Sequence, residues 1–145
     1  MALTENQQRT AMFEGYKEKP YLDTAGYPTI GHGEKLENIK YSSDQGVPSH
    51  LQGQTRNTDQ AGQSLQTHYQ SVEQDVSNRF GEHWDGIPDD IKGVILDMGY
   101  NVGSQGLFDK FPGFISDIKA GIKSGSYEGA ALNLKYKDPA LGDNP

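Results

Sequence analysis

The chain has 145 residues, enough for one domain, and only 33% of them are apolar, which predicts a thin hydrophobic core. Lys and Arg number 13 and Asp and Glu number 20, for a net charge of -7 that argues against a nucleic-acid partner. The absence of cysteine excludes disulfides and thiolate metal sites, and no window approaches the ~20 apolar residues of a membrane span.

The opening residues, MALTENQQRTAM, have neither a basic stretch nor an apolar segment. We therefore expect no cleavable signal peptide, and synthesis and folding in a cytoplasm.

The first predicted element is a helix over residues 5–14. Thr4 followed by Gln7 has the spacing of a capping box, in which each side chain bonds the backbone of the other residue. The chain then runs without Pro or Gly until Gly15, a typical C-terminal cap. Glu14 is thus expected to end the helix.

A β-hairpin is predicted over residues 19–31. Its strands flank the sequence Asp-Thr-Ala-Gly at 23–26, and Asp in the first position with Gly in the fourth suits a type I turn. Pro20 and Pro28 lack a backbone N–H, so we expect the hairpin to lie at the edge of a sheet.

A polar loop over residues 41–58 should precede a long helix over residues 59–80. Apolar residues recur every three or four positions along that helix, which predicts one buried stripe. They are Ala61, Leu65, Tyr69, Val72, Val76 and Phe80. Asn57 with Gln60 is a second capping box.

Short helices are predicted after residue 81, beginning near Pro88, Pro112 and Ser126. Gly103 should end the first of them and Pro139 the last. Their apolar stripes are Ile91, Ile95, Met98 and Val102, then Phe114, Ile118 and Ile122, then Ala130, Ala131 and Leu134. One hairpin among helices predicts an α+β fold.

Glu14, Asp23 and Thr29 form the candidate site. Taken singly, each has an ordinary explanation: a solvated carboxylate, the first residue of a turn and a β-branched strand residue. Together they stand at a helix end, a hairpin turn and the adjacent strand, which places three polar groups on one side of a short hairpin. That arrangement can form the wall of a cleft.

The stretch FEGYKEKPYLDTAGYPTIGHG at residues 13–33 resembles the active-site region of the phage-type lysozymes, the T-even endolysin-like family. The family pattern is Glu, eight residues, Asp, five residues, Thr, then Ile-Gly-x-Gly. Glu14, Asp23 and Thr29 to Gly33 fit it without a gap. Weaker similarity continues through TDQAGQSLQTHYQSVEQDV at 58–76, MGYNVG at 98–103 and SYEGAALNL at 126–134.

The resemblance implies a two-lobe lysozyme-like fold in a single domain over residues 1–145. A hairpin lobe with the active site would span 13–58, a connecting helix 59–80 and a helical lobe 81–145. Relatives continue past the SYEGAALNL segment with further helices, whereas this sequence ends in KDPALGDNP. The expectation is a C-terminally truncated lobe or a fragment, with apolar surface that a partner or a missing segment would cover.

The activity implied is hydrolysis of the β-1,4 bond between N-acetylmuramic acid and N-acetylglucosamine in peptidoglycan. Glu14 would be the acid and Asp23 the carboxylate, with the Thr29 hydroxyl holding the attacking water, an arrangement that inverts the anomeric centre. Cleavage of another glycan, such as chitin, is a smaller alternative.

Three further residues are candidates for substrate binding. Asn101 would contact the glycan from the helical lobe, Tyr27 would offer a sugar-stacking face, and His32 lies beside the site. Packing within the hairpin is an equally ordinary role for Tyr27 and His32. The histidines show no metal-ligand spacing and HExxH is absent, so we expect neither metal nor cofactor.

One pair departs from the family. Its best-known member has a His five residues after the Thr, paired with an Asp on the long helix. The matching positions here are Glu34 and His68, which suggests the same pair with its charges exchanged. Two unrelated surface groups are the alternative.

The expected partners are peptidoglycan glycan strands and other phage virion or lysis proteins, with no nucleic acid and no membrane span. The protein would be made in the cytoplasm of the bacterial host. It would reach the cell wall in the periplasm through a holin or as a virion component. The rival reading is a non-catalytic wall-binding or phage tail structural module. The acidic charge and short lobe favour the rival, and the intact Glu14, Asp23 and Thr29 favour the enzyme.

Overall fold

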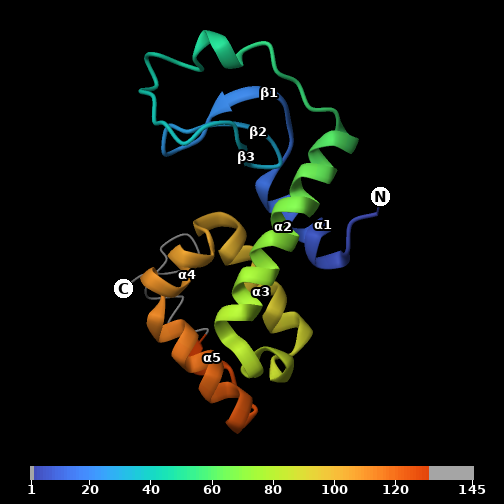
Figure 1. Cartoon of the computed structure of the whole chain (residues 1–145), viewed down its shortest axis with the longest axis vertical. Helices are drawn as coiled ribbons and strands as arrows, with labels where there is room; N and C mark the ends of the chain where they lie inside the picture. The colour runs from blue at the N-terminus through green and yellow to red at the C-terminus, as the bar shows by residue number, and fades with distance from the viewer. Residues whose placement is uncertain (1, 131–145) are drawn as a thin grey trace. The chain divides into compact units, whose positions relative to one another are not determined.

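The structure, a computed structural model, describes residues 2–130 (Figure 1). Its longer elements are α1 (Glu5–Glu14), β1 (Lys17–Leu22), β2 (Pro28–Gly31), β3 (Glu34–Lys35), α2 (Thr58–Phe80), α3 (Asp89–Val102), α4 (Ser104–Lys110) and α5 (Pro112–Ser124). Short 3-10 helices, η1 (Ser49–Leu51) and η2 (Gly81–Gly86), precede and follow α2. The predicted α+β class is confirmed. The chain divides into two compact units between Gln70 and Ser71, a boundary that falls inside α2.

Helix α1 begins and ends where the sequence predicts. The N–H of Gln7 donates to Oγ1 of Thr4 at 3.2 Å, and the N–H of Thr4 donates to the side chain of Gln7 at 3.0 Å, which completes the capping box. Gly15, at φ 72°, follows the last helical residue, Glu14. The buried Gln7 also accepts a hydrogen bond from Gln66 of α2 at 3.2 Å, so the two helices are tied together in the first unit.

The predicted hairpin is also present. Strands β1 and β2 pair antiparallel with Tyr21 opposite Thr29 and Leu22 opposite Pro28. The turn between them is closed by the N–H of Gly26, which donates to the carbonyl of Asp23 at 3.0 Å.

The expectation that Pro28 lies on an edge strand is wrong. The sheet has the order β1-β2-β3, so β2 is the central strand, and Thr29 pairs with Lys35 on its other side (Figure 1). Pro28 is tolerated because it stands first in its strand and contributes only a carbonyl, which accepts the N–H of Leu36 at 2.8 Å. Strand β3 has 2 residues, too few to show an alternating pattern in the sequence.

Helix α2 confirms the predicted stripe and cap. Every residue of the stripe is buried, with exposed fractions of 6% or less: Ala61, Leu65, Tyr69, Val72, Val76 and Phe80. Each large side chain of this kind contributes about 1.5–3 kcal/mol when fully buried. Asn57 and Gln60 exchange hydrogen bonds at 2.8 and 2.9 Å, which fixes where the helix begins.

In the second unit, α3 ends at Gly103 as predicted but buries a different face. Ile95 is buried, whereas Val102 of the predicted stripe is 38% exposed. Gly99 lies on the packed face, because a Cβ there would come within 2.8 Å of Cγ1 of Val72. Glycine carries no apolar signal in the sequence, so a helix face that uses it for close packing is missed by hydrophobic periodicity.

Helix α4 is not predicted by the sequence, because its 7 residues show less than two full turns of pattern. Helix α5 begins at Pro112 as expected and buries Phe114 and Ile118. Residues 128–130 are helical, in the segment predicted to follow Ser126. The remainder of that predicted helix, including Leu134 and Pro139, lies outside the described residues. Between residues 2 and 130, no helix is long and apolar enough to cross a membrane.

Candidate active site

Glu14 is the last residue of α1, and its half-buried side chain lies against the connection between β2 and β3. A Cβ added to Gly33 would stand 2.6 Å from Oε2 of Glu14, closer than real Cβ contacts. Gly33 also has φ +81°, a backbone conformation that strains other residues. Only glycine therefore allows the chain to pass this close to the carboxylate.

Asp23 holds the hairpin turn with one of its two carboxylate oxygens. Oδ1 accepts the backbone N–H of Ala25 at 3.0 Å and of Tyr27 at 2.8 Å. Oδ2 has no hydrogen-bond partner within residues 2–130. The turn role that the sequence suggested for Asp23 is thus real. The two hydrogen bonds to Oδ1 also orient the Asp23 carboxylate, and they leave Oδ2 available for a further interaction.

Thr29 lies in the central strand with 2% of its surface exposed. Its hydroxyl donates to the backbone carbonyl of Tyr27 at 2.8 Å. Because that bond uses the hydroxyl hydrogen, Oγ1 can serve a further polar group only as an acceptor.

Tyr21 lies near all three of these residues. It stands directly opposite Thr29 in the β1–β2 ladder. Burial raises the pKa of its phenol above 10.0, and the charges of Glu14 and then Asp23 raise it further. Both carboxylates therefore act on one phenol. The sequence analysis did not select Tyr21 as a site residue, although counting back from the turn would have set it opposite Thr29.

His32 lies next to the end of α1. Its Nδ1 is 2.7 Å from the carbonyl of Gly15, so Nδ1 carries the proton and donates. Its ring lies 5.7 Å from the ring of Tyr16. These contacts connect the β2–β3 turn to the residues that follow Glu14. Substrate binding by His32 stays a prediction.

The ring of Tyr27 is approached by two lysines. The ammonium of Lys35 lies 3.9 Å from the ring centroid and that of Lys40 lies 5.4 Å away. Such cation–π contacts occupy part of the ring surface. A sugar that stacks on Tyr27 would displace a lysine or share the ring with it, and this contact too stays a prediction.

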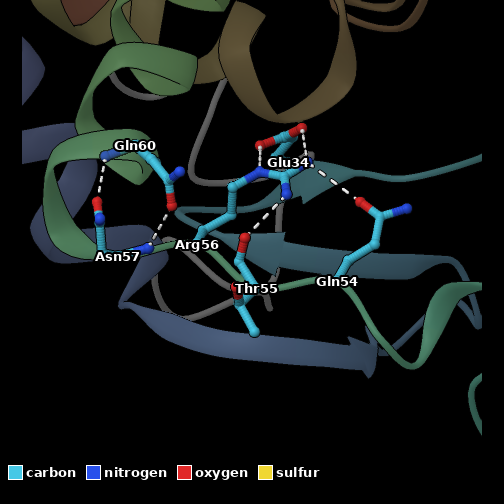
Figure 2. A network of polar contacts seen from close by, with 6 residues as sticks. All are labelled: Glu34, Gln54, Thr55, Arg56, Asn57 and Gln60. Carbon is cyan, nitrogen blue, oxygen red and sulfur yellow. Dashed lines mark hydrogen bonds and ion pairs between the residues drawn. The ribbon is translucent and has the colours of Figure 1, made fainter.

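Glu34, for which the sequence suggested His68 as partner, forms its ion pair with Arg56. Nε and Nη2 of Arg56 donate to the two carboxylate oxygens of Glu34, each at 3.2 Å (Figure 2). The arginine lies just before α2, 22 positions from Glu34 in the sequence. A Glu34–His68 interaction stays a prediction.

The chain matches the family described as Phage lysozyme over residues 11–140. It belongs to the phage lysozyme family. The match includes Glu14, Asp23 and Thr29, the residues whose pattern suggested the resemblance.

The structure of this phage lysozyme family member is similar to the solved structure of the endolysin from Escherichia coli O157:H7 phage FAHEc1. The TM-score is 0.63 with 23% sequence identity, over 94% of this chain and 76% of the endolysin chain. At this identity the likeness shows the fold, which is lysozyme-like. Comparison with curated proteins gives no match.

Asn101 belongs to the second unit of this lysozyme-like chain. It lies near the end of α3, is exposed, and donates from Nδ2 to the carbonyl of Asp97 at 3.1 Å. This contact holds the amide along the helix. Its role toward substrate stays a prediction. Within the described residues, no cluster of His, Asp and Glu has an arrangement that could hold a metal ion.

Proposed function

We propose that this phage lysozyme family member is a muramidase, which hydrolyses the β-1,4 bond between N-acetylmuramic acid and N-acetylglucosamine in peptidoglycan. Family membership supports a peptidoglycan hydrolase in general. The observation that carries the finer proposal is geometric: Asp23 holds the hairpin turn with one carboxylate oxygen, Thr29 lies in the central strand, and the Glu14 carboxylate lies against Gly33 just beyond that strand. Two carboxylates and a hydroxyl around one side of a hairpin are the groups that glycoside hydrolysis needs.

Glu14 serves as the general acid that protonates the leaving oxygen. It ends α1, where the backbone carbonyls carry the negative end of the helix dipole, and α1 has no basic residue in its last turn. Its carboxylate is half-buried against Gly33. The helix dipole opposes a negative charge on Glu14, and nearby Lys17 and Lys19 act against that effect.

Asp23 and Thr29 prepare the attacking water. The turn N–H groups hold Oδ1 of Asp23, and Oδ2 takes a proton from water. The Thr29 oxygen accepts the other hydrogen of that water, because its own hydrogen is bonded to Tyr27. Attack by such a water on the face opposite Glu14 inverts the anomeric centre, for which inverting enzymes keep the two carboxyl groups about 6.5–9.5 Å apart.

The substrate is the glycan strand of the bacterial cell wall, with Tyr27, His32 and Asn101 as candidate contacts. The reaction as proposed uses acid, carboxylate and water alone, without metal or cofactor. Access to the wall would come after release by a holin or as part of a virion, where other lysis or virion proteins are the partners.

The test is release of reducing ends and loss of turbidity from purified peptidoglycan by the wild type and by Glu14→Gln. Glu5→Gln is the matched control, since Glu5 lies in the first turn of the same helix and is exposed. We expect cleavage by the wild type and by Glu5→Gln, and loss of about 10²-fold or more in Glu14→Gln. Proton NMR of the fresh product should show inversion, and a chelator should leave the rate unchanged.

A folded wild type that binds peptidoglycan but releases no reducing ends would overturn the muramidase proposal in favour of a non-catalytic wall-binding or tail module. Cleavage of chitin without cleavage of peptidoglycan would instead overturn the proposed substrate.

A further inference from the structure

Arg56 has hydrogen bonds to three parts of the first unit. Its N–H donates to the carbonyl of Glu18 in β1 at 2.9 Å, and its carbonyl accepts the hydroxyl of Tyr16 at 2.7 Å. Its guanidinium donates to both carboxylate oxygens of Glu34 in β3. The residue stands just before α2, whose first turn is capped by Asn57 and Gln60 (Figure 2).

The ion pair between Arg56 and Glu34 fixes the orientation of both side chains. Two nearly equal N–H···O contacts of 3.2 Å join the planar guanidinium to the planar carboxylate. Nη1 also donates to the carbonyl of Thr55 at 3.0 Å and Nη2 to the side chain of Gln54 at 3.3 Å. The side chains of Arg56 and Glu34 are 23% and 30% exposed, so solvent screens the pair less than an open surface pair.

Glu34 immediately follows Gly33, the residue against which the Glu14 carboxylate lies. Gly31 and Gly33 both have positive φ, at 66° and 81°, and lack side chains that could hold this short segment in place. The Cγ of Arg56 itself lies 3.9 Å from the Cβ position of Gly31. His32, between Gly31 and Gly33, is held by the carbonyl of Gly15, and Glu34 is the second anchor of the segment that carries Gly33 past Glu14.

The backbone of Arg56 also holds the chain that follows Glu14. Tyr16, which donates to the Arg56 carbonyl, is two residues beyond Glu14. One residue thus holds both the chain that leaves α1 and the chain that passes over the Glu14 side chain.

We propose that Arg56 is a positioning residue for the muramidase reaction, which holds Gly33 against the carboxylate of Glu14 through its paired hydrogen bonds to Glu34. This role rests on the proposed function, in which Glu14 is the acid. Misplacement of a reacting group by about 1 Å can cost 10²-fold in rate.

The test compares Arg56→Lys and Glu34→Gln with a matched control, Arg79→Lys. Lysine keeps the charge of Arg56 but cannot donate to both carboxylate oxygens in the fork geometry, and glutamine keeps the shape of Glu34. Arg79 pairs with Asp75 at 3.7 Å on α2, in the second unit. We expect kcat for reducing-end release to fall about 10- to 100-fold in the first two variants with KM little changed, and no change in the control.

A second readout does not depend on activity. NMR titration of the Tyr21 ring reports the surroundings that it shares with Glu14, because burial and then the charge of Glu14 raise the phenol pKa. In Arg56→Lys and in Glu34→Gln we expect the titration midpoint of Tyr21 to change. The double variant should change this midpoint no further than either single variant. The Arg79→Lys protein should keep the wild-type midpoint.

An unchanged Tyr21 midpoint in both folded variants overturns the positioning role, whatever happens to the rate. Additive effects in the double variant also overturn it. If the wild type releases no reducing ends while the midpoint still changes, the proposed function fails but the hold of Arg56 on the Glu14 environment stands.

Discussion

The carboxylate of Glu14 lies so close to Gly33 that a Cβ on the glycine would stand 2.6 Å from Oε2. The residue that ends the first helix and the residue that precedes β3 thus meet through a contact that only glycine permits.

Gly33→Ala should reduce activity more than it reduces stability. The methyl group would push the Glu14 side chain away, and the positive φ of 81° adds backbone strain of about 1–2 kcal/mol. We expect a fall of about 10²-fold in reducing-end release.

Gly46→Ala separates the two effects, because Gly46 has φ +67° with nothing within 4 Å of its Cβ position. It should lower thermal stability similarly and leave activity intact. Equal rates for the two variants would contradict the Glu14 contact as a determinant of activity.

Asp23→Asn and Asp23→Ala should separate the turn from the chemistry. Asparagine keeps an oxygen that can accept the N–H groups of Ala25 and Tyr27, so stability should stay within about 0.5 kcal/mol. Alanine leaves both donors without that partner and should cost about 1–3 kcal/mol. Both variants should lose about 10²-fold or more in activity, measured beside chemical denaturation. Full activity in Asp23→Asn would restrict Asp23 to its turn role.

Thr29→Val removes a hydroxyl while nearly keeping the side-chain volume. The carbonyl of Tyr27 still accepts the N–H of Asp23 at 3.0 Å, so it keeps one hydrogen bond in the variant. The loss of stability should therefore be about 1 kcal/mol, less than the cost of a buried carbonyl without any partner. Activity should fall about 10- to 100-fold as the attacking water loses its acceptor. Thr29→Ser, which keeps the hydroxyl, should recover most of the rate. A fast Thr29→Val enzyme would rule out a water-holding role.

The titration of Tyr21 should depend on both carboxylates. Burial raises the phenol pKa most, and the negative charges of Glu14 and then of Asp23 raise it further. Glu14→Gln should therefore lower the Tyr21 midpoint, and Asp23→Asn should lower it less. NMR with labelled tyrosine rings resolves Tyr21 from the other tyrosines. Glu5→Gln should leave the midpoint unchanged, and the same result for Glu14→Gln would refute the proximity.

The loop beyond β3 should make stability depend on pH. Glu37 accepts hydrogen bonds from the hydroxyl of Tyr41 and from Nε2 of His50, and these two contacts, led by Tyr41, lower its pKa below the ordinary 4.5. A lowered pKa means that this stabilisation is present above about pH 4.5 and is lost as the pH falls through the lower folded-state value.

Glu37→Gln should consequently lower the melting temperature near neutral pH. The difference in melting temperature between wild type and variant should become smaller as the pH is lowered. Asp44→Asn, a change at an exposed position of the same loop, serves as the control. A wild-type minus Glu37→Gln difference that is constant with pH would contradict the pKa shift.

Local signals predicted much of the fold. Both capping boxes, at Thr4 and Asn57, form as expected, and the stripe of α2 is buried throughout. These features depend on residues three or four positions apart, whose geometry the helix itself imposes. Strand β3, helix α4 and the packed face of α3 were missed. Two of them are too short to show a period, and the third packs through Gly99.

The sequence by itself determined which residues compose the candidate site: Glu14 at a helix end, Asp23 in a turn and Thr29 in the adjacent strand. Their types and spacing are properties of one short stretch of chain. Only the tertiary structure decided that the Glu14 carboxylate lies against Gly33 and that Arg56 forms an ion pair with Glu34. Those contacts join elements separated along the chain, and their geometry follows from how helix and sheet pack, which local propensity does not specify.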